Sequence, residues 1–413
     1  MTATASATSA TALTRSDQLN IFTVSMGHGI THWLHIVPTV LLLVVKDEFG
    51  LDYTDVGLYG SVYAAAATVT NLAGGPLTDL IGRRERFMLA SLIIMAVSMV
   101  ALYFVVDFWS FLAAAVLVSI GNHLWHPAAI PYLASRYEER RGYALSIHSL
   151  FSNLGDSAAP TVVGGMIAGW YFLTFSWRET ALLNALPVLL LLPAFIIIVM
   201  PRRTKENRTQ KEGMNFGDYI HGIWGQLKNK AVLGLALMAG FRSTAQHSLR
   251  LFFPFYIAEV LTDLTVAEAA GFAGLALTAL NLGGSFAAIP AGIASDRYGR
   301  RPIVMWALAL STVFIFSLSF LQDEFSLVIG ISLVGFSIYA LRPVMVGWMM
   351  DIVPREFRGS CTNLMFTTQS AMQMVSPLIA GAIADVYGVV YVFYFAAGLL
   401  LLANTVAFML PKK

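Results

Sequence analysis

The chain has 413 residues, of which 57% are hydrophobic and only 12% are charged, and its formal net charge is +2. Soluble globular proteins are close to half apolar and about a quarter charged, so this composition excludes an ordinary water-soluble protein. The only cysteine, Cys361, excludes an intrachain disulfide.

The N-terminal segment, residues 1–18, is small and polar. It lacks the apolar core of a signal peptide. We expect it to form a disordered cytoplasmic tail.

Twelve apolar segments follow, each long enough to cross a bilayer core as a helix, which takes roughly 20 residues. Because a helix satisfies its own backbone hydrogen bonds in lipid, the predicted fold class is an all-α polytopic membrane protein. The expected segments are 19–45, 55–78, 86–106, 108–134, 142–171, 179–200, 231–258, 267–294, 302–321, 325–350, 359–384 and 387–410.

One long polar and basic loop, residues 201–230, separates the first six segments from the last six. We therefore expect an N-terminal six-helix half at 19–200, a cytoplasmic linker at 201–230 and a C-terminal six-helix half at 231–410. With both termini and the linker in the cytoplasm, most of the 26 Lys and Arg residues lie on that side, and only Lys46 and Arg178 lie outside. This predicts a multi-pass protein of a bacterial inner (plasma) membrane.

The two halves repeat a motif of the form Gly-x-x-x-Asp-x-x-Gly-Arg-Arg. It reads "GPLTDLIGRR" at 75–84 and "GIASDRYGRR" at 292–301, an offset of 217 residues. The same offset carries Pro160 onto Pro377. Such a repeat indicates two halves related by pseudo-two-fold symmetry, with a substrate site between them near mid-membrane.

The repeated motif is a candidate gate. Its glycines would let the helix approach a neighbour and turn tightly, and its Asp would pair with Arg at a helix end. A basic loop that only sets membrane orientation is the alternative. The predicted gating residues are Gly75, Asp79, Gly82, Arg83, Arg84, Gly292, Asp296, Gly299, Arg300 and Arg301.

These loops and the twelve-segment plan resemble the major facilitator superfamily over nearly the whole chain. The resemblance implies a secondary transporter that works by alternating access, with helices 1, 4, 7 and 10 lining a central cavity. Residues 121–160, with His126-Pro127, Arg141-Gly142 and Asn153-x-Gly155…Pro160, resemble its fosmidomycin-resistance branch. That branch implies proton-driven efflux of a drug or metabolite.

Histidines concentrate in the first and fourth segments. His28, His32 and His35 are spaced i, i+4 and i+7, so they share one helix face, and His123 and His126 lie on the fourth segment. Histidine ordinarily titrates near pH 6.5, so a cavity lined by it can change charge during transport. The alternative is hydrogen-bonded packing against neighbouring helices.

Asp156 is the only acidic residue that we place at mid-membrane. A carboxyl group there is costly and is a natural proton carrier, with His32 and His148 as partners. The alternative is an Asp locked to a neighbouring helix. Its counterpart in the second half is Gln373, so a proton site is expected in the first half only.

Arginines mark the second half, where Arg242, Arg250 and Arg342 lie within predicted spans. Their planar guanidinium groups grip carboxylate, phosphate or phosphonate, so they predict an anionic substrate. Local pairing, such as Arg342 with Asp351, is the alternative. The predicted substrate-binding residues are His28, His32, His35, His123, His126, Arg242, Gln246, His247, Tyr339, Arg342 and Gln373.

The function expected from these features is proton-coupled secondary transport of a small organic anion or anionic drug, with efflux favoured by the resemblance. The alternative cargo is a transition metal or metal chelate bound by the histidines. No nucleotide-binding loop or nucleophile elbow occurs, so we expect no enzyme. The expected partners are the anion, protons and the lipid bilayer, with no nucleic acid, no cofactor and a monomeric state.

Overall fold

The computed structural model describes residues 13–201, 225, 229–354 and 358–410, and within these ranges it is helical without strands. Most of the predicted tail and of the predicted linker 201–230 lies outside the described residues. The first helix begins at Arg15, inside the range expected for the tail, because Thr14 and Asp17 form a capping box that satisfies its first backbone N–H groups.

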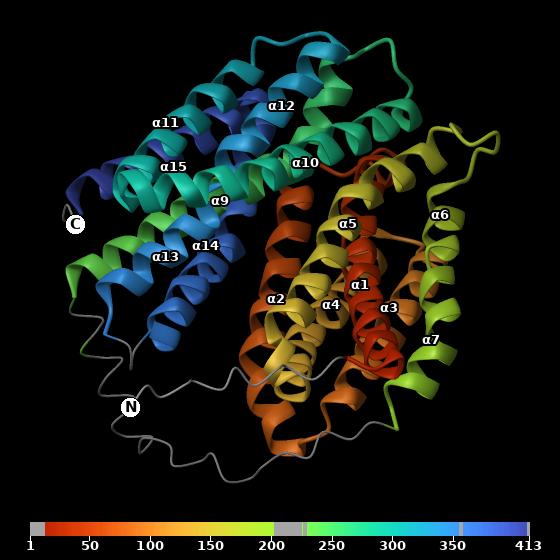
Figure 1. Ribbon diagram of the computed structural model, residues 1–413. Coiled ribbons are helices and arrows are strands. Elements are labelled where there is room, and N and C mark those ends of the chain that lie inside the picture. Colours follow the sequence, from red (N-terminus) through yellow and green to blue (C-terminus); the bar gives the residue numbers. More distant parts are fainter. Residues whose placement is uncertain (1–12, 202–224, 226–228, 355–357, 411–413) are drawn as a thin grey trace, which may run out of the picture.

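The described helices form two bundles, seen side by side in Figure 1. The N-terminal half contains α1 (Arg15–Phe49), α2 (Tyr53–Ile81), α3 (Arg84–Tyr103), α4 (Phe108–Arg136), α5 (Arg141–Ile167), α6 (Trp177–Leu183) and α7 (Leu186–Ile198). The C-terminal half contains α9 (Lys230–Val260), α10 (Val266–Tyr298), α11 (Arg300–Leu318), α12 (Glu324–Tyr339), α13 (Leu341–Ile352), α14 (Arg358–Tyr387) and α15 (Val390–Met409). Because α6 continues into α7 and α12 into α13, these helices make twelve membrane-crossing segments, which confirms the predicted fold class.

The sixth and tenth segments are each broken by a proline. Helix α6 ends at Leu183 and α12 at Tyr339, each four residues before a proline, Pro187 and Pro343. Proline lacks a backbone N–H and its ring clashes with the carbonyl four residues earlier, so both breaks follow from local chemistry.

Eight of the segments in the described ranges are long and apolar enough to cross a membrane by length and composition alone. The other four are α2, α5, α9 and α14, which carry more polar and small residues. These four helices pack against the opposite half or line the cavity described below, so much of their surface faces protein instead of lipid.

The halves meet along two helix pairs, α2 with α14 and α5 with α10. At Gly57 a Cβ would collide with the carbonyl oxygen of Pro377, and at Gly274 with the carbonyl oxygen of Pro160. The offset of 217 residues carries Gly57 onto Gly274 and Pro160 onto Pro377. The two contacts, which we call the α2–α14 seam and the α5–α10 seam, are therefore one glycine-to-proline contact used twice, as pseudo-two-fold symmetry requires.

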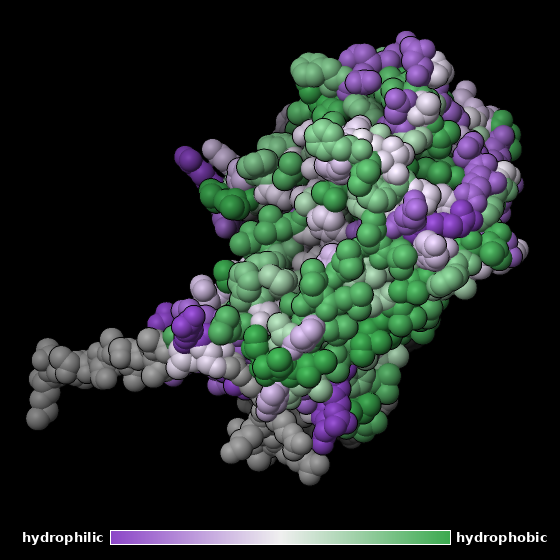
Figure 2. All heavy atoms as spheres, turned by 90° about the vertical axis from the view of Figure 1, so that its right-hand side faces the viewer, coloured by the Kyte–Doolittle hydropathy of each residue, from purple (hydrophilic) through white to green (hydrophobic). Residues whose placement is uncertain are grey.

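The outer surface matches a lipid environment. In the view of Figure 2, hydrophobic side chains cover a broad band and hydrophilic side chains gather towards its two ends. Large apolar side chains such as Trp306, Phe316 and Leu190 are exposed, which is the arrangement that hydrocarbon favours.

The motif glycines divide into two kinds. Gly82 and Gly299 have positive φ values of 64° and 92°, so the tight turn expected there is confirmed. At Gly75 and Gly292 a Cβ would meet nothing within 4 Å. The expectation that these two let their helices approach a neighbour is wrong for the described part of the chain, where no neighbouring atom lies close to them.

Candidate functional site

A cavity of about 190 Å³ lies between the two halves. Helices α1, α2 and α4 contribute one side, and α9 and α14 contribute the other. Its lining residues are His35, Thr39, Tyr59, Gly60, Tyr63, Ala64, Ala67, Asn122, His123, His247, Arg250, Leu251 and Gln373.

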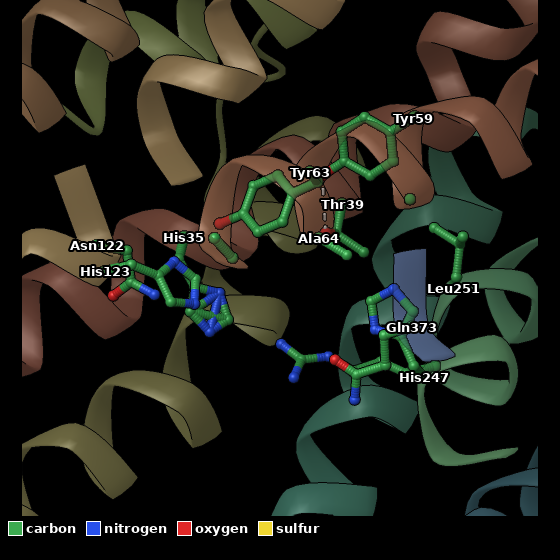
Figure 3. A pocket seen from close by; sticks show the side chains of 13 residues that line it. His35, Thr39, Tyr59, Tyr63, Ala64, Asn122, His123, His247, Leu251 and Gln373 are labelled. Carbon is green, nitrogen blue, oxygen red and sulfur yellow. Dashed lines mark hydrogen bonds between the residues drawn. The ribbon is translucent and has the colours of Figure 1, made fainter. Parts of the chain in front are cut away.

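Polar side chains from both halves face this cavity. Figure 3 shows His35, Asn122 and His123 on one side, with His247 and Gln373 across the open space. Substrate in this position would contact both halves, which is what a transporter that moves its halves against each other needs.

Four of the predicted binding residues line the cavity: His35, His123, His247 and Gln373. Arg250 also lines it, although it is not among the predicted binding residues. The sequence held a signal for it, because Arg250 lies three residues after His247 and so shares its helix face.

Two tyrosines of α2 were also missed. Tyr59 and Tyr63 line the cavity, and the hydroxyl groups of Tyr59 and Thr39 are hydrogen-bonded at 3.0 Å. Their i, i+4 spacing on one helix was the available signal. The second helix therefore contributes directly to the cavity.

Beside the cavity, three histidines converge through their Nε2 atoms. Nε2 of His126 lies 3.3 Å from Nε2 of His28 and 3.3 Å from Nε2 of His32. On the far side of the rings, Nδ1 of His28 lies 2.8 Å from the carbonyl oxygen of His148, and Nδ1 of His126 lies 3.2 Å from that of Asn122. We call His28, His32 and His126 the histidine trio.

Asp156 joins the histidine trio to the cavity. Its Oδ2 lies 3.0 Å from Nδ1 of His32, and its Oδ1 lies 3.4 Å from Nε2 of His35, which lines the cavity. Its backbone carbonyl accepts a hydrogen bond of 2.7 Å from Asn281 on α10. Asp156 therefore lies where α1 meets the α5–α10 seam, within electrostatic reach of Arg250.

His148 lies behind the histidine trio. Its ring is stacked on that of His28 at 3.7 Å, and its Nε2 accepts a hydrogen bond of 3.2 Å from the indole N–H of Trp125. His148 is buried and supports the ring of His28, and the described contacts do not link its side chain to Asp156.

Arg242 and Arg342 lie near the break in the tenth segment. Arg242 is buried and donates to the carbonyl of Ile338 at 3.2 Å, while its Nε has no partner in the described residues. Arg342 is exposed, with its guanidinium carbon 5.6 Å from the ring centre of Phe366. Neither residue lines the cavity.

The three membrane arginines lack acidic partners in the described part of the chain. No carboxylate there lies within 4.0 Å of Arg242, Arg250 or Arg342, and Asp351 instead pairs with Arg300 at 3.2 Å. The alternative of a local Arg342–Asp351 pair is therefore not what the structure shows. Arg250, on the C-terminal side of the cavity, therefore has no directly paired carboxylate among the described residues.

The remaining predicted binding residues lie around these arginines. Gln373 donates to the hydroxyl of Ser243 at 2.5 Å. The hydroxyl of Tyr339 has no partner within the described ranges, and Gln246 is half-buried on α9.

The two gating loops differ in their contacts. Arg300 pairs with Asp296 at 2.5 Å and with Asp351, and Arg301 donates to the carbonyl of Ala407 at 3.2 Å. These contacts tie α10, α11, α13 and α15 together inside the C-terminal half.

In the N-terminal loop, Arg84 donates to the hydroxyl of Ser135 at 3.5 Å. The side chain of Asp79 lies outside the described residues, and Arg83 precedes α3 as its N-cap. The described hydrogen bond of this loop is therefore within one half as well.

This architecture defines the class of protein: a polytopic helical transporter with a polar cavity between two halves. The family model described as Major Facilitator Superfamily matches residues 19–271 and 248–413. The chain belongs to the Major Facilitator Superfamily, a family of transporters and not of enzymes, and it is an integral membrane protein.

Individual relatives agree with this placement. The chain is 28% identical over 196 residues to "Uncharacterized MFS-type transporter YwoD" of Bacillus subtilis (strain 168), a match that spans 48% of the chain and only 39% of that relative. It is 25% identical over 406 residues to "Multidrug efflux pump Tap" of Mycolicibacterium fortuitum, spanning 94% of the chain and 93% of the pump.

A solved structure shares the fold. The crystal structure of a bacterial homolog of the human lysosomal transporter Spinster, in an inward-facing and occupied conformation, aligns with a TM-score of 0.80. The alignment covers 96% of this chain and 97% of that one at 15% sequence identity, so it shows the common fold alone.

Proposed function

We propose that this transporter exports a small organic anion in exchange for protons by alternating access. The observation that carries the proposal is Arg250, a cation that lines the cavity between the halves without a described acidic partner. Arg242 and Arg342, which lie outside the cavity lining, add two more arginines without a described acidic partner to the C-terminal half.

The anion would bind to the guanidinium groups. A buried charge without a partner is costly, and a carboxylate, phosphate or phosphonate offsets that cost through paired N–H···O bonds. His247 and Gln373 lie beside Arg250 in the lining and supply further polar contacts.

Protons would bind at Asp156. Its carboxylate lies between His32 and His35, so a proton has ring nitrogens on either side within 3.4 Å. The side chains of His32 and Asp156 keep 17% and 27% of their surface exposed, so they are partly accessible. His35, 3.4 Å from the Asp156 carboxylate, links them to the cavity that it lines. His148 would take part indirectly, by positioning His28.

We also propose a gating role for Arg300 and Arg301. Arg300 and Arg301 connect the ends of four helices in one half, so their contacts would keep that half rigid while the seams between the halves open.

The proposed direction of transport and the proposed orientation in the membrane are supported by the amino-acid sequence. Export is supported by the similarity to the relative named as the multidrug efflux pump Tap and by the resemblance of residues 121–160 to the fosmidomycin-resistance branch. The excess of Lys and Arg in the linker 201–230 supports cytoplasmic termini. We propose that the monomer is the working unit.

A bare metal cation is a less suitable cargo for this cavity. It would meet the positive charge of Arg250 in the lining, and the other two arginines lie on the same half. An anionic metal chelate avoids that repulsion and stays in the test below as the alternative.

The test is thermal stabilisation of the detergent-solubilised protein at two pH values. The ligand panel contains small carboxylates, phosphonates including fosmidomycin, divalent metals and metal chelates. A ligand that binds the folded state raises its apparent stability by mass action. We expect an anion to raise the Tm of the wild type, and Arg250→Gln and Arg342→Gln to reduce that shift.

Arg297→Gln is the matched control, because it removes an exposed arginine in the last turn of α10, and it should keep the full shift. Stabilisation by metals alone, or an anion shift that survives in both Arg250→Gln and Arg342→Gln, would contradict the proposal.

A further inference from the structure

The histidine trio brings three nitrogen lone pairs to one point. Nδ1 of His28 and Nδ1 of His126 each face a backbone carbonyl oxygen, which can only accept a hydrogen bond. Nδ1 of His32 faces the Asp156 carboxylate, which also accepts. Each neutral ring must therefore carry its proton on Nδ1, and each Nε2 is left with a lone pair.

Three converging lone pairs repel one another unless a positive group lies between them. Each histidine of the trio offers one ring nitrogen that lies within 4.8 Å of the other two, and Nε2 of His126 lies 3.3 Å from Nε2 of both neighbours. With every ring proton on Nδ1, no Nε2 carries a proton to donate in these contacts. A hydrogen bond between two of them would require a second proton on one ring, which makes that ring a cation. A metal ion removes the repulsion and leaves all three rings neutral.

The spacing of these atoms fits metal coordination. Metal–nitrogen bonds of about 2.0–2.1 Å at a tetrahedral angle place two ligand nitrogens roughly 3.3 Å apart. His126 Nε2 lies 3.3 Å from both of its neighbours. We propose that His28, His32 and His126 bind a divalent transition-metal ion of the zinc class through their Nε2 atoms.

The groups behind the rings are those that a metal site needs. Metal-bound histidine usually donates its other N–H to a carboxylate or a carbonyl, which fixes the tautomer and strengthens the ligand. All three Nδ1 atoms of the trio have such an acceptor: the Asp156 carboxylate at 3.0 Å and two carbonyl oxygens at 2.8 and 3.2 Å. With the ion bound, the Asp156 carboxylate, the His32 ring and the metal would form a carboxylate–histidine–metal triad.

Charge and ligand type select the metal. Three neutral imidazoles suit zinc, copper, nickel or iron, whereas magnesium and calcium prefer oxygen ligands. The Asp156 carboxylate lies 3.0 Å from Nδ1 of His32, so its negative charge offsets part of the charge of the ion. With three protein ligands, a fourth position stays open for water, and the side chain of His32 is 17% exposed.

The ion would join two helices. His28 and His32 lie on α1 and His126 on α4, so the bound metal would cross-link them inside the N-terminal half. The site shares His32 and Asp156 with the proposed proton site. The two proposals are tested separately, because metal binding to the purified protein and anion-dependent stabilisation are separate readouts.

The test uses the purified full-length protein without a polyhistidine tag. Co²⁺ is titrated in, and its visible ligand-field absorption reports a four-coordinate site; Zn²⁺ is then added to displace it. We expect one equivalent of Co²⁺ to bind with the spectrum of a tetrahedral nitrogen site. X-ray absorption of the Zn²⁺-loaded wild type should show about three imidazole nitrogens at roughly 2.0 Å.

Variants assign the site. His126→Gln should weaken binding by roughly 100-fold or more, because it removes the nitrogen that both other ligands approach. Asp156→Asn leaves all three ligands in place and should weaken binding by about 10–100-fold, the usual cost of losing a carboxylate behind a metal-bound histidine. His221→Gln, in the linker 201–230, should bind like the wild type.

Three outcomes would overturn the proposal: no stoichiometric binding to the wild type, an octahedral oxygen-rich spectrum, or binding that His126→Gln leaves unchanged. The wild-type spectra keep the test decisive even if a variant does not fold. Absence of metal binding together with intact anion stabilisation would leave protons as the occupants of the histidine trio.

Discussion

The two halves use one scaffold for different chemistry. The N-terminal half holds six of the eight histidines and Asp156, whereas the C-terminal half holds His247 and the three membrane arginines. The offset of 217 residues carries His32 onto Leu249 and Asp156 onto Gln373. His32 and Asp156, which meet beside the cavity, therefore correspond to residues of the C-terminal half that cannot ionise.

At the two seams, by contrast, the halves have the same residues at corresponding positions. Gly57 and Gly274 correspond, as do Pro160 and Pro377, and each glycine receives the carbonyl of the other half's proline. Close backbone packing tolerates almost no change, so the repeat retained these residues. The cavity-facing positions were free to diverge because water, ligand or a partner side chain can fill the space.

The largest effect is expected from Asp156→Asn, which removes the acidic group that distinguishes the N-terminal half at this position. Asp156→Asn keeps the size of the side chain and an acceptor for His32, but it cannot carry a proton. In proteoliposomes, movement of the stabilising anion driven by a pH gradient should fall to background, while exchange down an anion gradient continues. Asp47→Asn, at an exposed position of α1, is the control and should keep both modes.

Loss of both transport modes in Asp156→Asn would assign this residue a structural role at the α5–α10 seam. The hydrogen bond from Asn281 to the backbone carbonyl of residue 156 does not depend on the side chain, so the seam itself should survive the substitution.

An intermediate effect tests the symmetry of the seams. Gly57→Ala and Gly274→Ala each place a methyl group against a backbone carbonyl, so overpacking should cost about 1–3 kcal/mol in the closed-seam conformation. Thermal unfolding should show similar losses of Tm for both variants. Gly398→Ala, where a Cβ meets nothing within 4 Å, is the control and should not lose stability. A large loss in only one of the two seam variants would contradict the equivalence of the seams.

The smallest expected effect concerns the gating loop of the C-terminal half. Arg300 pairs with Asp296 and Asp351, whose side chains are 68% and 56% exposed, so solvent screens both ion pairs. Arg300→Gln should therefore cost less than about 1 kcal/mol of stability. The loss should shrink at high salt, as measured by Tm at two ionic strengths, and should exceed that of Arg297→Gln. A loss that is independent of salt would instead indicate that the bond from Arg300 to Ser295 dominates.

Local features of the fold were readable from the sequence because their causes are local. Apolar length gave the twelve segments, and positive φ at Gly82 and Gly299 follows from the motif turns. The breaks before Pro187 and Pro343 likewise follow from proline chemistry, although apolar length alone predicts continuous segments at 179–200 and 325–350.

Only part of the candidate site could be predicted from the sequence, and the reason is physical. Helical spacing places His28 and His32 on one face, but it does not say which helix that face meets. The amino-acid sequence by itself determined the membrane spans, the repeat and the presence of histidines in one half and arginines in the other. Only the tertiary structure decided that His126 meets His28 and His32, that Arg250 lines the cavity, and that Asp351 pairs with Arg300. These pairings depend on the rotation and tilt of whole helices, which packing across the seams sets and which local sequence does not encode.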